Sequence, residues 1–334
     1  MGVSASLKTI AAEAGVSVST VSRAFTRPDL IGERTRSEIL AIADRLGYRP
    51  NRSARGLVTG RTTTVGLLVP DIANPFFPPL VRAAQDRAYE RGYAVLLMDT
   101  DEHADRERAL LADLTGRVDG LVLCSPRSAA AQIRELAGQL PLVCVNRTIP
   151  GVSSVLCTTR DGLGDVVDHL HSLGHRRIAY LAGPATSWSD RERRASVRQQ
   201  ATRRKMEVTV LGPYPATFDG GVLAGDAVLA TDCTAAVAFD DVVALGAMRR
   251  LTELGYDVPG QFSISGCDDI FFAAMTMPSL STVATPIAQA GRAAIDLLMD
   301  ALAQPDRRRV QQVTLSGEFI ARGSTGPAPR RAGS

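Results

Sequence analysis

The alternation of apolar and amphipathic segments that begins at Val65 restricts the fold more than any other feature. Short apolar runs of strand length alternate with longer segments in which apolar residues recur at helical spacing. Strands separated by helices in this way form parallel sheets that are covered by helices on both faces. The pattern continues for about 260 residues, which exceeds one doubly wound unit. We therefore expect two similar α/β lobes with a ligand between them, at the carboxyl ends of the strands.

Residues 6–46 have a different pattern, which predicts three short helices around a small core. Ser6 and Ser17 are suitable N-caps, and Gly15 is a suitable residue to end the first helix. From Arg49 onward the composition becomes basic and polar and includes glycine, which marks a linker. We expect a helical domain at 1–48, a linker at 49–63, a two-lobed α/β domain at 64–323 and a disordered tail at 324–334.

Charge is distributed unevenly along the chain. Residues 1–61 hold ten basic and five acidic residues, a net charge of +5. The remaining 28 basic and 30 acidic residues give −2, so that the whole chain carries +3. A basic head on a nearly neutral body predicts a polyanionic partner at the amino-terminal end only.

Other features argue against export, membrane insertion and metal binding. No apolar run reaches the ~18 residues of a bilayer span, and the first residues lack the layout of a secretory signal, so we expect a cytoplasmic protein. His169, His171 and His175 are spaced so that they do not stack on one helix face, which predicts a solvated helix end and no metal site. The five cysteines stand far apart, mostly in apolar runs, and this predicts reduced thiols at Cys124, Cys144, Cys157, Cys233 and Cys267.

The segment AAEAGVSVSTVSRAF has the turn chemistry of a helix-turn-helix motif. Residues 14–17 provide a helix end, a tight turn and the cap of a second helix, whose first turn can enter a major groove. There Arg23 can donate a bidentate pair of hydrogen bonds to guanine, and Val18 can contact a thymine methyl group. Ser19 or Thr20 can bond to base edges or phosphate. The alternative is a three-helix bundle with a charged face that is only solvated.

Longer motifs extend this picture along almost the whole chain. They are AGVSVSTVSRAF, RTRSEILAIADRLGYRPN, SARGL, VGLLVPDIANPFF, LGHRRIAYLAG, AVAFDD, ISGCDD and PSLSTV. Together they resemble the lactose/galactose repressor (LacI/GalR) family. The resemblance implies a ligand-responsive, sequence-specific transcription regulator, most often a repressor, that binds a pseudo-palindromic DNA operator as a homodimer. It also implies a sensor related to periplasmic sugar-binding proteins, with a carbohydrate effector and no cofactor.

The resemblance further implies a hinge helix in the linker. In the family this helix orders on DNA beside its dimer mate and inserts a leucine into the minor groove, and Leu57 is the matching residue. Gly56 stands where the family often has serine, and glycine within a helix costs about 1 kcal/mol relative to alanine, so we expect a hinge that folds reluctantly. The residues expected at the DNA are Lys8, Ser17, Val18, Ser19, Thr20, Ser22, Arg23, Asn51, Ala54, Arg55 and Leu57.

The family positions that line the sensor cleft carry a coherent chemistry. Arginine donors and aspartate acceptors can satisfy neighbouring hydroxyl groups, and an aromatic ring can cover the apolar face of a sugar. Arg193 and Asp268 are the central pair, and two aspartate doublets make the cleft acidic, with the second residue of each doublet expected to cap a helix. The expected ligand-binding residues are Asn74, Phe76, Phe77, Ser125, Arg147, Trp188, Arg193, Phe218, Asp240, Asp268 and Thr285.

Enzymes with parallel α/β lobes carry motifs that this sequence lacks. GLVTGRT is one residue shorter than a phosphate loop and has Arg61 in place of lysine, and GLGDVV lacks the third glycine of a dinucleotide site. No G-x-S-x-G elbow occurs. We therefore expect no catalytic residues and no enzymatic activity. The alternatives are a purine- or nucleoside-responsive regulator of the same family and, more distantly, an α/β enzyme or a small-molecule sensor that does not bind DNA.

Overall fold

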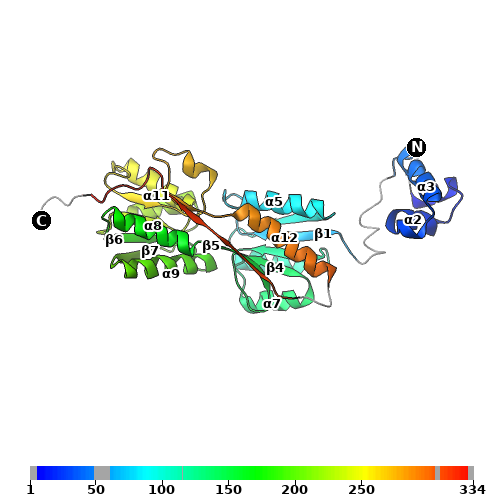
Figure 1. Cartoon of the computed structure of the whole chain (residues 1–334), viewed down its shortest axis with the longest axis horizontal. Helices are drawn as coiled ribbons and strands as arrows, with labels where there is room; N and C mark the ends of the chain where they lie inside the picture. The colour runs from blue at the N-terminus through cyan, green and yellow to red at the C-terminus, as the bar shows by residue number, and fades with distance from the viewer. Residues whose placement is uncertain (1–5, 49–60, 115, 305–308, 330–334) are drawn as a thin grey trace. The chain divides into compact units, whose positions relative to one another are not determined.

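The computed structural model describes residues 6–48, 61–114, 116–304 and 309–329 (Figure 1). The chain divides into two compact units, residues 1–63 and 64–334. Within the described ranges no helix combines the length and the apolar character needed to cross a bilayer. The hinge residues expected from the family lie outside the described ranges: Asn51, Ala54, Arg55, Gly56 and Leu57.

The amino-terminal unit is the expected bundle of three helices. The side chains of Ser6 and Ser17 each accept a hydrogen bond from the backbone N–H three residues further on, at 3.2 Å and 3.0 Å, and so cap the first two helices. Gly15 has a φ of +64° in the turn between them, a conformation that favours glycine. The largest fully buried side chains are Ile10, Val21 and Ile39. The elements are α1 (Leu7–Glu13), α2 (Val18–Thr26), the 3-10 helix η1 (Pro28–Leu30) and α3 (Glu33–Arg45).

The first lobe of the second unit contains a parallel sheet of six strands, in the order β2-β1-β3-β4-β5-β11. Strands β1, β3 and β4 are buried almost throughout, as expected where helices cover both faces. The elements are β1 (Thr64–Val69), α5 (Phe77–Glu90), β2 (Ala94–Asp99), α6 (Ala104–Leu114), β3 (Gly120–Cys124), α7 (Ala130–Gln139), β4 (Leu142–Val145), β5 (Ser153–Thr158), α12 (Ile287–Ala303) and β11 (Gln312–Ser316).

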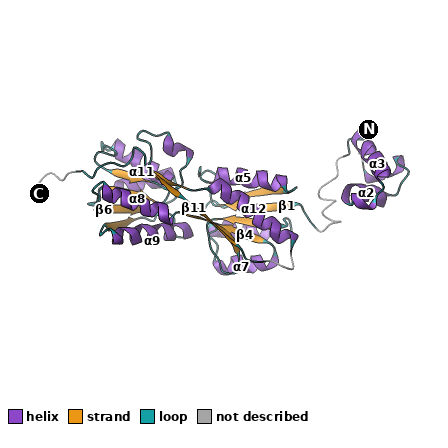
Figure 2. Cartoon of the chain, in the orientation of Figure 1, coloured by secondary structure: helices purple, strands orange, loops and turns teal. Residues whose placement is uncertain are grey.

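The second lobe contains a parallel sheet of four strands, in the order β7-β6-β8-β9, and a small antiparallel pair, β10 and β12. The prediction of two doubly wound lobes is therefore confirmed, and Figure 2 shows the strands of each lobe flanked by helices. The elements are α8 (Arg160–Ser172), β6 (Arg177–Leu181), α9 (Trp188–Arg203), β7 (Glu207–Leu211), α10 (Phe218–Val228), β8 (Ala235–Ala238), α11 (Asp241–Glu253), β9 (Ser263–Ser265), η2 (Phe271–Ala274), β10 (Thr282–Ala284) and β12 (Glu318–Ile320).

Three short segments connect the lobes, after β5, between β10 and α12, and between β11 and β12. They lie against one another. The backbone N–H of Gly317 donates to the carbonyl oxygen of Thr158 at 2.9 Å. A Cβ atom at Gly317 would lie only 2.7 Å from the carbonyl oxygen of Ala284, so the close approach of the three segments requires glycine at this position.

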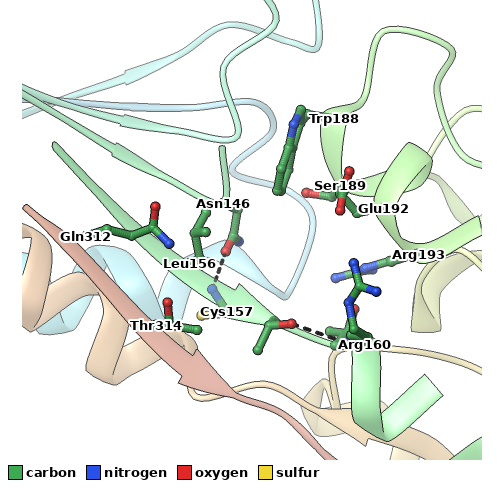
Figure 3. A pocket seen from close by; sticks show the side chains of 12 residues that line it. Asn146, Leu156, Cys157, Arg160, Trp188, Ser189, Glu192, Arg193, Gln312 and Thr314 are labelled. Atoms are coloured by element: carbon green, nitrogen blue, oxygen red, sulfur yellow. Dashed lines mark hydrogen bonds between the residues drawn. The ribbon is translucent and has the colours of Figure 1, made fainter. Parts of the chain in front are cut away.

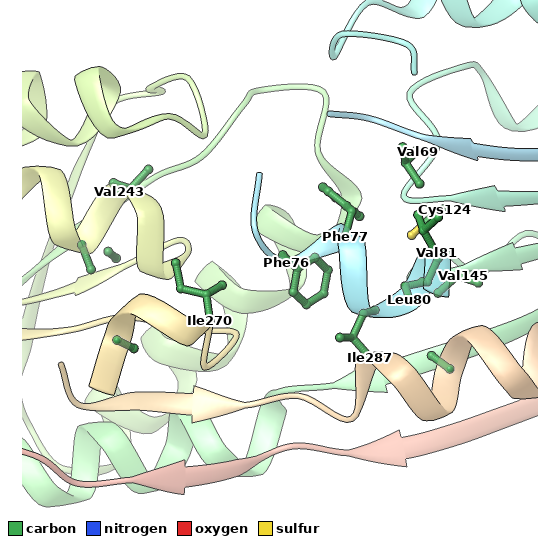
Figure 4. Close-up of a cluster of buried hydrophobic side chains, with 14 of the residues drawn as sticks. Val69, Phe76, Phe77, Leu80, Val81, Cys124, Val145, Val243, Ile270 and Ile287 are labelled. Carbon is green, nitrogen blue, oxygen red and sulfur yellow. The ribbon is translucent and has the colours of Figure 1, made fainter. Parts of the chain in front are cut away.

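The largest apolar cluster includes residues of both lobes. The rings of Phe76 and Phe77 pack edge to face, with centroids 5.1 Å apart. Figure 4 shows these rings between Leu80 of the first lobe and Ile270 of the second. The two lobes therefore share buried apolar surface beside the carboxyl ends of their strands. The five cysteines are free, as predicted, and three of them are buried: Cys124, Cys144 and Cys267.

The prediction of a disordered tail from residue 324 is wrong for residues 324–329. Ser324 is fully buried, and its hydroxyl donates to the carbonyl oxygen of Ile264 at 2.6 Å. The backbone N–H of Gly326 donates to the hydroxyl of Ser263, and that of Ala328 donates to the carbonyl oxygen of Leu173. Small residues allow this segment to lie against β9 and the end of α8, whereas composition alone indicated disorder.

The prediction of a solvated helix end at the histidine cluster is wrong for His175. This side chain is fully buried, with Nδ1 2.7 Å from the hydroxyl of Thr234 and Nε2 3.1 Å from the carbonyl oxygen of Gly326. Burial lowers its pKa. The histidine therefore holds the carboxyl-terminal segment against the second lobe. Among the described residues, no group of three or more His, Cys, Asp or Glu side chains could hold a metal ion.

The contact between α10 and α11 predicts a sharp asymmetry between two glycines. A Cβ at Gly246 would lie 2.1 Å from the carbonyl oxygen of Phe218, which is backbone and cannot move aside. At Gly138 in α7 no atom lies within 4 Å of such a Cβ. We expect Gly246→Ala to lower the free energy of unfolding by about 1–3 kcal/mol through overpacking. The control Gly138→Ala should raise it by about 0.5–1 kcal/mol. Urea denaturation of both variants measures this, and equal values for the two would refute the packing argument.

Candidate functional site: the cleft between the sensor lobes

The cleft lies where the strands of both sheets end. Parallel strands direct their carboxyl ends to the same edge, and the residues that follow them meet there. The first lobe contributes residues after β1, β2, β3 and β4, and the second contributes residues after β6, β7, β8 and β9 together with α9. The inner part of the cleft is lined by Asn74, Phe76, Phe77, Glu102, Ser125, Arg127, Asn146, Ser187, Ser189, Arg193, Ala216, Phe239, Asp240 and Asp268.

Arg193 and Asp268 form a buried ion pair at the centre of this lining. Arg193 Nη2 donates to Asp268 Oδ1 at 2.6 Å, with only 8% and 5% of the two side chains exposed. Arg193 Nη1 donates to the carbonyl oxygen of Phe239 at 2.6 Å, and the guanidinium carbon lies 5.0 Å from the centre of the Phe239 ring. The guanidinium is therefore fixed by three interactions, which is the preorganisation that recognition of a polar ligand needs.

Asp240 is a second buried acid beside this pair. Its Oδ1 accepts from the backbone N–H of Val243 at 2.8 Å and caps α11, while its Oδ2 lies 3.5 Å from Asn74 Nδ2 of the other lobe. Burial, reinforced by the negative charge of Asp268, raises the pKa of Asp240 to about 7. Burial also raises the pKa of Asp268, although Arg193 opposes this. The centre of the cleft therefore has more acid groups than cations.

The helix-capping prediction for the aspartate doublets is wrong in its order. In the first doublet the cap is Asp240, the first residue, whereas Asp241 accepts from the backbone N–H of Ile270 at 2.8 Å and from the hydroxyl of Thr282. In the second doublet Asp269 pairs with Arg322 at 2.6 Å. Asp241 and Asp269, the second residues of the doublets, thus hold loops of the second lobe together. Asp240 and Asp268, the first residues, are the ones that line the cleft.

A second charged pair stiffens the first-lobe wall. Arg127 forms a two-pronged contact with Glu102, at 2.6 Å and 2.8 Å, and donates to the carbonyl oxygen of Ser125 at 2.9 Å. The carboxylate of the buried Glu107 accepts from the backbone N–H of Arg127 and of Ser128. These bonds satisfy the charges at the wall and hold the loop after β3 in place.

The cleft continues into a larger outer compartment. The volume of the outer compartment is about 190 Å³. The inner compartment has a volume of about 30 Å³, which is close to the space that one water molecule occupies. The two compartments share Asn146, Ser189 and Arg193. Figure 3 shows the outer compartment between α9 on one side and β5 and β11 on the other. It is lined by Asn146, Leu156, Cys157, Thr158, Thr159, Arg160, Trp188, Ser189, Glu192, Arg193, Gln312 and Thr314.

The structure brings together most of the residues that were expected at the ligand. The inner compartment contains Asn74, Phe76, Phe77, Ser125, Arg193, Asp240 and Asp268, and the outer compartment contains Trp188.

Three of the expected residues line neither compartment. Arg147 donates to the carbonyl oxygens of Pro126 and Ser128 at 2.8 Å and 2.6 Å, so it braces a loop. Phe218 is 45% exposed at the start of α10, and Thr285 lies at a connection between the lobes with its hydroxyl buried.

Several lining residues were missed because they are ordinary polar residues in loops. Glu102, Arg127 and Asn146 each follow a strand of the first sheet by one to three residues, and this position is the signal that could have identified them. Asn146 has a φ of +56°, and its neighbour Arg147 bonds to the loop after β3 and lines neither compartment. Gln312 and Thr314 could not be identified in this way, since they belong to a strand that returns from the far end of the chain.

The amino-terminal unit presents a second candidate site on α2. Val21 and Ala24 of this helix are buried, whereas Val18, Ser19 and Arg23 are exposed. An exposed valine beside exposed polar residues at the start of a helix fits contact with base edges in a groove. Of the predicted DNA-contacting residues, the described ones that are wholly or partly exposed are Lys8, Ser17, Val18, Ser19, Thr20, Ser22 and Arg23.

A helix-turn-helix head and a two-lobed α/β sensor with a polar cleft together define a ligand-binding transcription regulator. Residues 6–51 match the model of bacterial regulatory proteins of the lacI family, and residues 167–325 match that of a periplasmic binding protein-like domain. The chain belongs to the LacI family of DNA-binding transcription regulators. It is 32% identical to catabolite control protein A of Priestia megaterium over 86% of this chain and 90% of that protein.

Solved structures agree with this assignment. The Lac repressor dimer bound to operator and the anti-inducer ONPF matches with a TM-score of 0.86 and 26% identity, over 96% of this chain and 99% of that one. The complex of the transcriptional regulator CelR with cellobiose matches with a TM-score of 0.70 and 29% identity, over 96% and 99% of the two chains. The family predicted from the sequence motifs is therefore confirmed.

The raised pKa of Asp240 predicts a pH-dependent effect of its replacement. A carboxyl group with a folded pKa near 7 and an unfolded pKa near 3.9 contributes stability below about pH 4, and this contribution is lost as the pH rises through 7. Asn cannot ionise and is an equally good N-cap. We expect the stability of Asp240→Asn relative to the unchanged protein to rise by about 2–3 kcal/mol between pH 5 and pH 8. Urea denaturation at both pH values measures this, with the exposed Asp300→Asn as control. A difference that is the same at both pH values would contradict the prediction.

Proposed function

We propose that this regulator is a repressor that binds a pseudo-palindromic DNA operator as a homodimer. We further propose that a small hydroxylated effector in the cleft changes its affinity for the operator. The observation that carries the proposal is the buried centre formed by Arg193, Asp268 and Asp240 at the carboxyl ends of both sheets. The Asn74–Asp240 approach brings groups of the two lobes together at this centre. A ligand bound there touches both lobes and can shift their relative position.

The chemistry of the centre favours a sugar. Asp240 and Asp268 accept from hydroxyl groups, Arg193 and Asn74 donate to them, and Phe76 offers an apolar surface for ring carbons. The CelR structure contains cellobiose, which is consistent with this assignment for a relative. The rings of Phe76 and Phe77 also suit stacking on a nucleobase, so a nucleoside is the second candidate.

Exposed apolar side chains of the second lobe are consistent with a dimer, since these groups would otherwise face water. They belong to α10 and to η2 with the turn that follows. They are Leu223, Phe271, Phe272, Met275 and Met277, with exposed fractions between 49% and 98%. The matching Lac repressor structure is a dimer.

The proposed DNA contact of Arg23 can be tested by one substitution. We expect Arg23→Met to weaken binding to the preferred duplex about 10- to 100-fold, since a bidentate contact to guanine provides about 1–3 kcal/mol of discrimination. Thermal stability should not change, because this side chain is exposed. The probe is the duplex enriched from a random pool by the unchanged protein, measured by fluorescence anisotropy. The control Arg45→Met removes the same charge from the last turn of α3 and should have a much smaller effect. Equal losses for the two variants would show that Arg23 provides charge alone.

The proposed effector site is tested by ligand-induced stabilisation. A ligand that binds the native state raises its apparent stability, so sugars and nucleosides can be screened by thermal shift. The substitution Arg193→Lys keeps a positive charge opposite Asp268. An ammonium group lacks the planar pair of donors with which the guanidinium bonds to both Asp268 and the carbonyl oxygen of Phe239. We expect this variant to lose about 90% or more of the affinity for the ligand that is found, and the ligand to shift operator binding reciprocally. A ligand whose affinity is the same with and without operator would refute the coupling.

A further inference from the structure

We propose that helix α9 carries a docking surface for an acidic segment of another protein. The surface is formed by Arg191, Arg194 and Arg198, which we call the arginine stripe. None of these three side chains lines either compartment of the cleft, so the stripe is separate from the effector site. The inference therefore goes beyond the proposed function and does not depend on which effector the cleft binds.

The stripe lies on a face of α9 that does not pack against the second lobe. The helix packs against α8 and β7, at the margin of the lobe in Figure 1. Arg191, Arg194 and Arg198 are separated by three and four residues, so they share one face over about two turns. Arg191 and Arg198 are exposed and Arg194 is half-buried. The buried residues of the helix are Asp190, Arg193, Ser196, Val197 and Ala201.

The arginines of the stripe have no acidic partner in the chain. Within the described residues, the ion pairs of α9 and its end are made by Arg193 and Arg204, and not by the stripe. In α11, by contrast, Arg249 donates to Glu253 one turn further on, at 2.8 Å. Like charges three or four residues apart on a helix repel each other. The stripe therefore costs stability in the free protein, and an external anion would relieve this repulsion.

The distribution of charge favours a short partner over a long polyanion. Helix α9 contains five arginines and two acidic residues, whereas the rest of residues 62–334 contains 23 basic and 28 acidic residues. The two acids of α9 are occupied elsewhere. Asp190 is buried and accepts from the backbone N–H of Gly183 at 2.8 Å, and Glu192 lines the outer compartment. A long polyanion would extend from the stripe over a body of net negative charge, whereas a short acidic segment contacts the stripe alone.

The side chains around the stripe favour carboxylates over nucleic acids and lipids. Its exposed neighbours on the same face are Ala195 and Thr202. They provide neither an aromatic ring on which a base could stack nor a large apolar group that could enter a bilayer. Arginine binds a carboxylate through two parallel hydrogen bonds. A helix whose acidic residues recur at intervals of three and four presents its carboxylates at the spacing of the stripe, so the partner is an acidic helical segment.

The stripe is tested by binding of a labelled acidic peptide to the full chain. The probe has about twelve residues, with glutamates at every third or fourth position among alanines, and its control has glutamine in place of glutamate. We expect only the glutamate peptide to bind, with an affinity that falls as salt is added. Replacing the stripe by Arg191→Gln, Arg194→Gln and Arg198→Gln together should weaken binding about tenfold or more, measured by fluorescence anisotropy. The proposal is wrong if the peptide does not bind the unchanged protein or binds this variant equally well.

A matched variant and two further measurements identify the occupant. Arg106→Gln, Arg117→Gln and Arg134→Gln together remove three exposed arginines from the first lobe and should leave peptide binding nearly unchanged. Equal losses for the two triple variants would show that net charge alone attracts the peptide. The stripe variant should bind the preferred duplex and a random duplex as the unchanged protein does, which also shows that it folds. Weaker binding of the random duplex would make the stripe a nucleic-acid surface, and a smaller assembly in sedimentation would make it a contact between copies of this chain. Each of these three results would overturn the proposal.

Discussion

The buried ion pair between Arg193 and Asp268 is the interaction on which the sensor cleft depends. Removing two charges from water costs several kcal/mol per ion, and such a pair persists only when further bonds satisfy the remaining groups. Here the guanidinium also bonds to the carbonyl oxygen of Phe239 and lies beside its ring. Arg193 belongs to α9, Phe239 follows β8, and Asp268 follows β9 with a φ of +119°. The pair thus joins three elements of the second lobe at one edge of its sheet and makes a rigid wall.

This wall explains the chemistry of the cleft. One of its two acids is neutralised by Arg193, whereas Asp240 has the N–H of Val243 and a distant amide of Asn74. A buried acceptor that lacks full hydrogen bonding is costly, so a ligand with hydroxyl donors gains affinity by completing its bonds. In the first-lobe wall, Arg127 and Glu102 satisfy each other's charges. The acid of the inner compartment that has no cationic partner is therefore Asp240 of the second lobe, and Asn74 provides the polar group of the first lobe that approaches it.

The parts of the structure that follow from local rules could be predicted from the sequence. The caps at Ser6 and Ser17 and the turn at Gly15 depend only on neighbouring residues. The strands could be predicted because they are apolar runs in the sequence. Contacts between distant segments could not be predicted in this way. The burial of His175 requires the carboxyl-terminal segment to return, and the lining by Gln312 requires β11 to join the first sheet. Asn146 lines the cleft in place of the predicted Arg147, and this depends on the backbone conformation at Asn146, which composition does not reveal.

The geometry of the lobe connections indicates how occupancy could reach the DNA-binding head. The three connecting segments touch one another at Gly317, where backbone meets backbone, so they are expected to move together and to serve as the pivot between the lobes. The outer compartment lies directly beside this pivot, because its lining includes Thr158, Thr159 and Arg160, where β5 passes into α8. A small displacement next to a pivot becomes a larger displacement at the far ends of two rigid lobes. The first lobe begins with β1, so a rotation of one lobe against the other about this pivot would also displace the start of β1 relative to the second lobe.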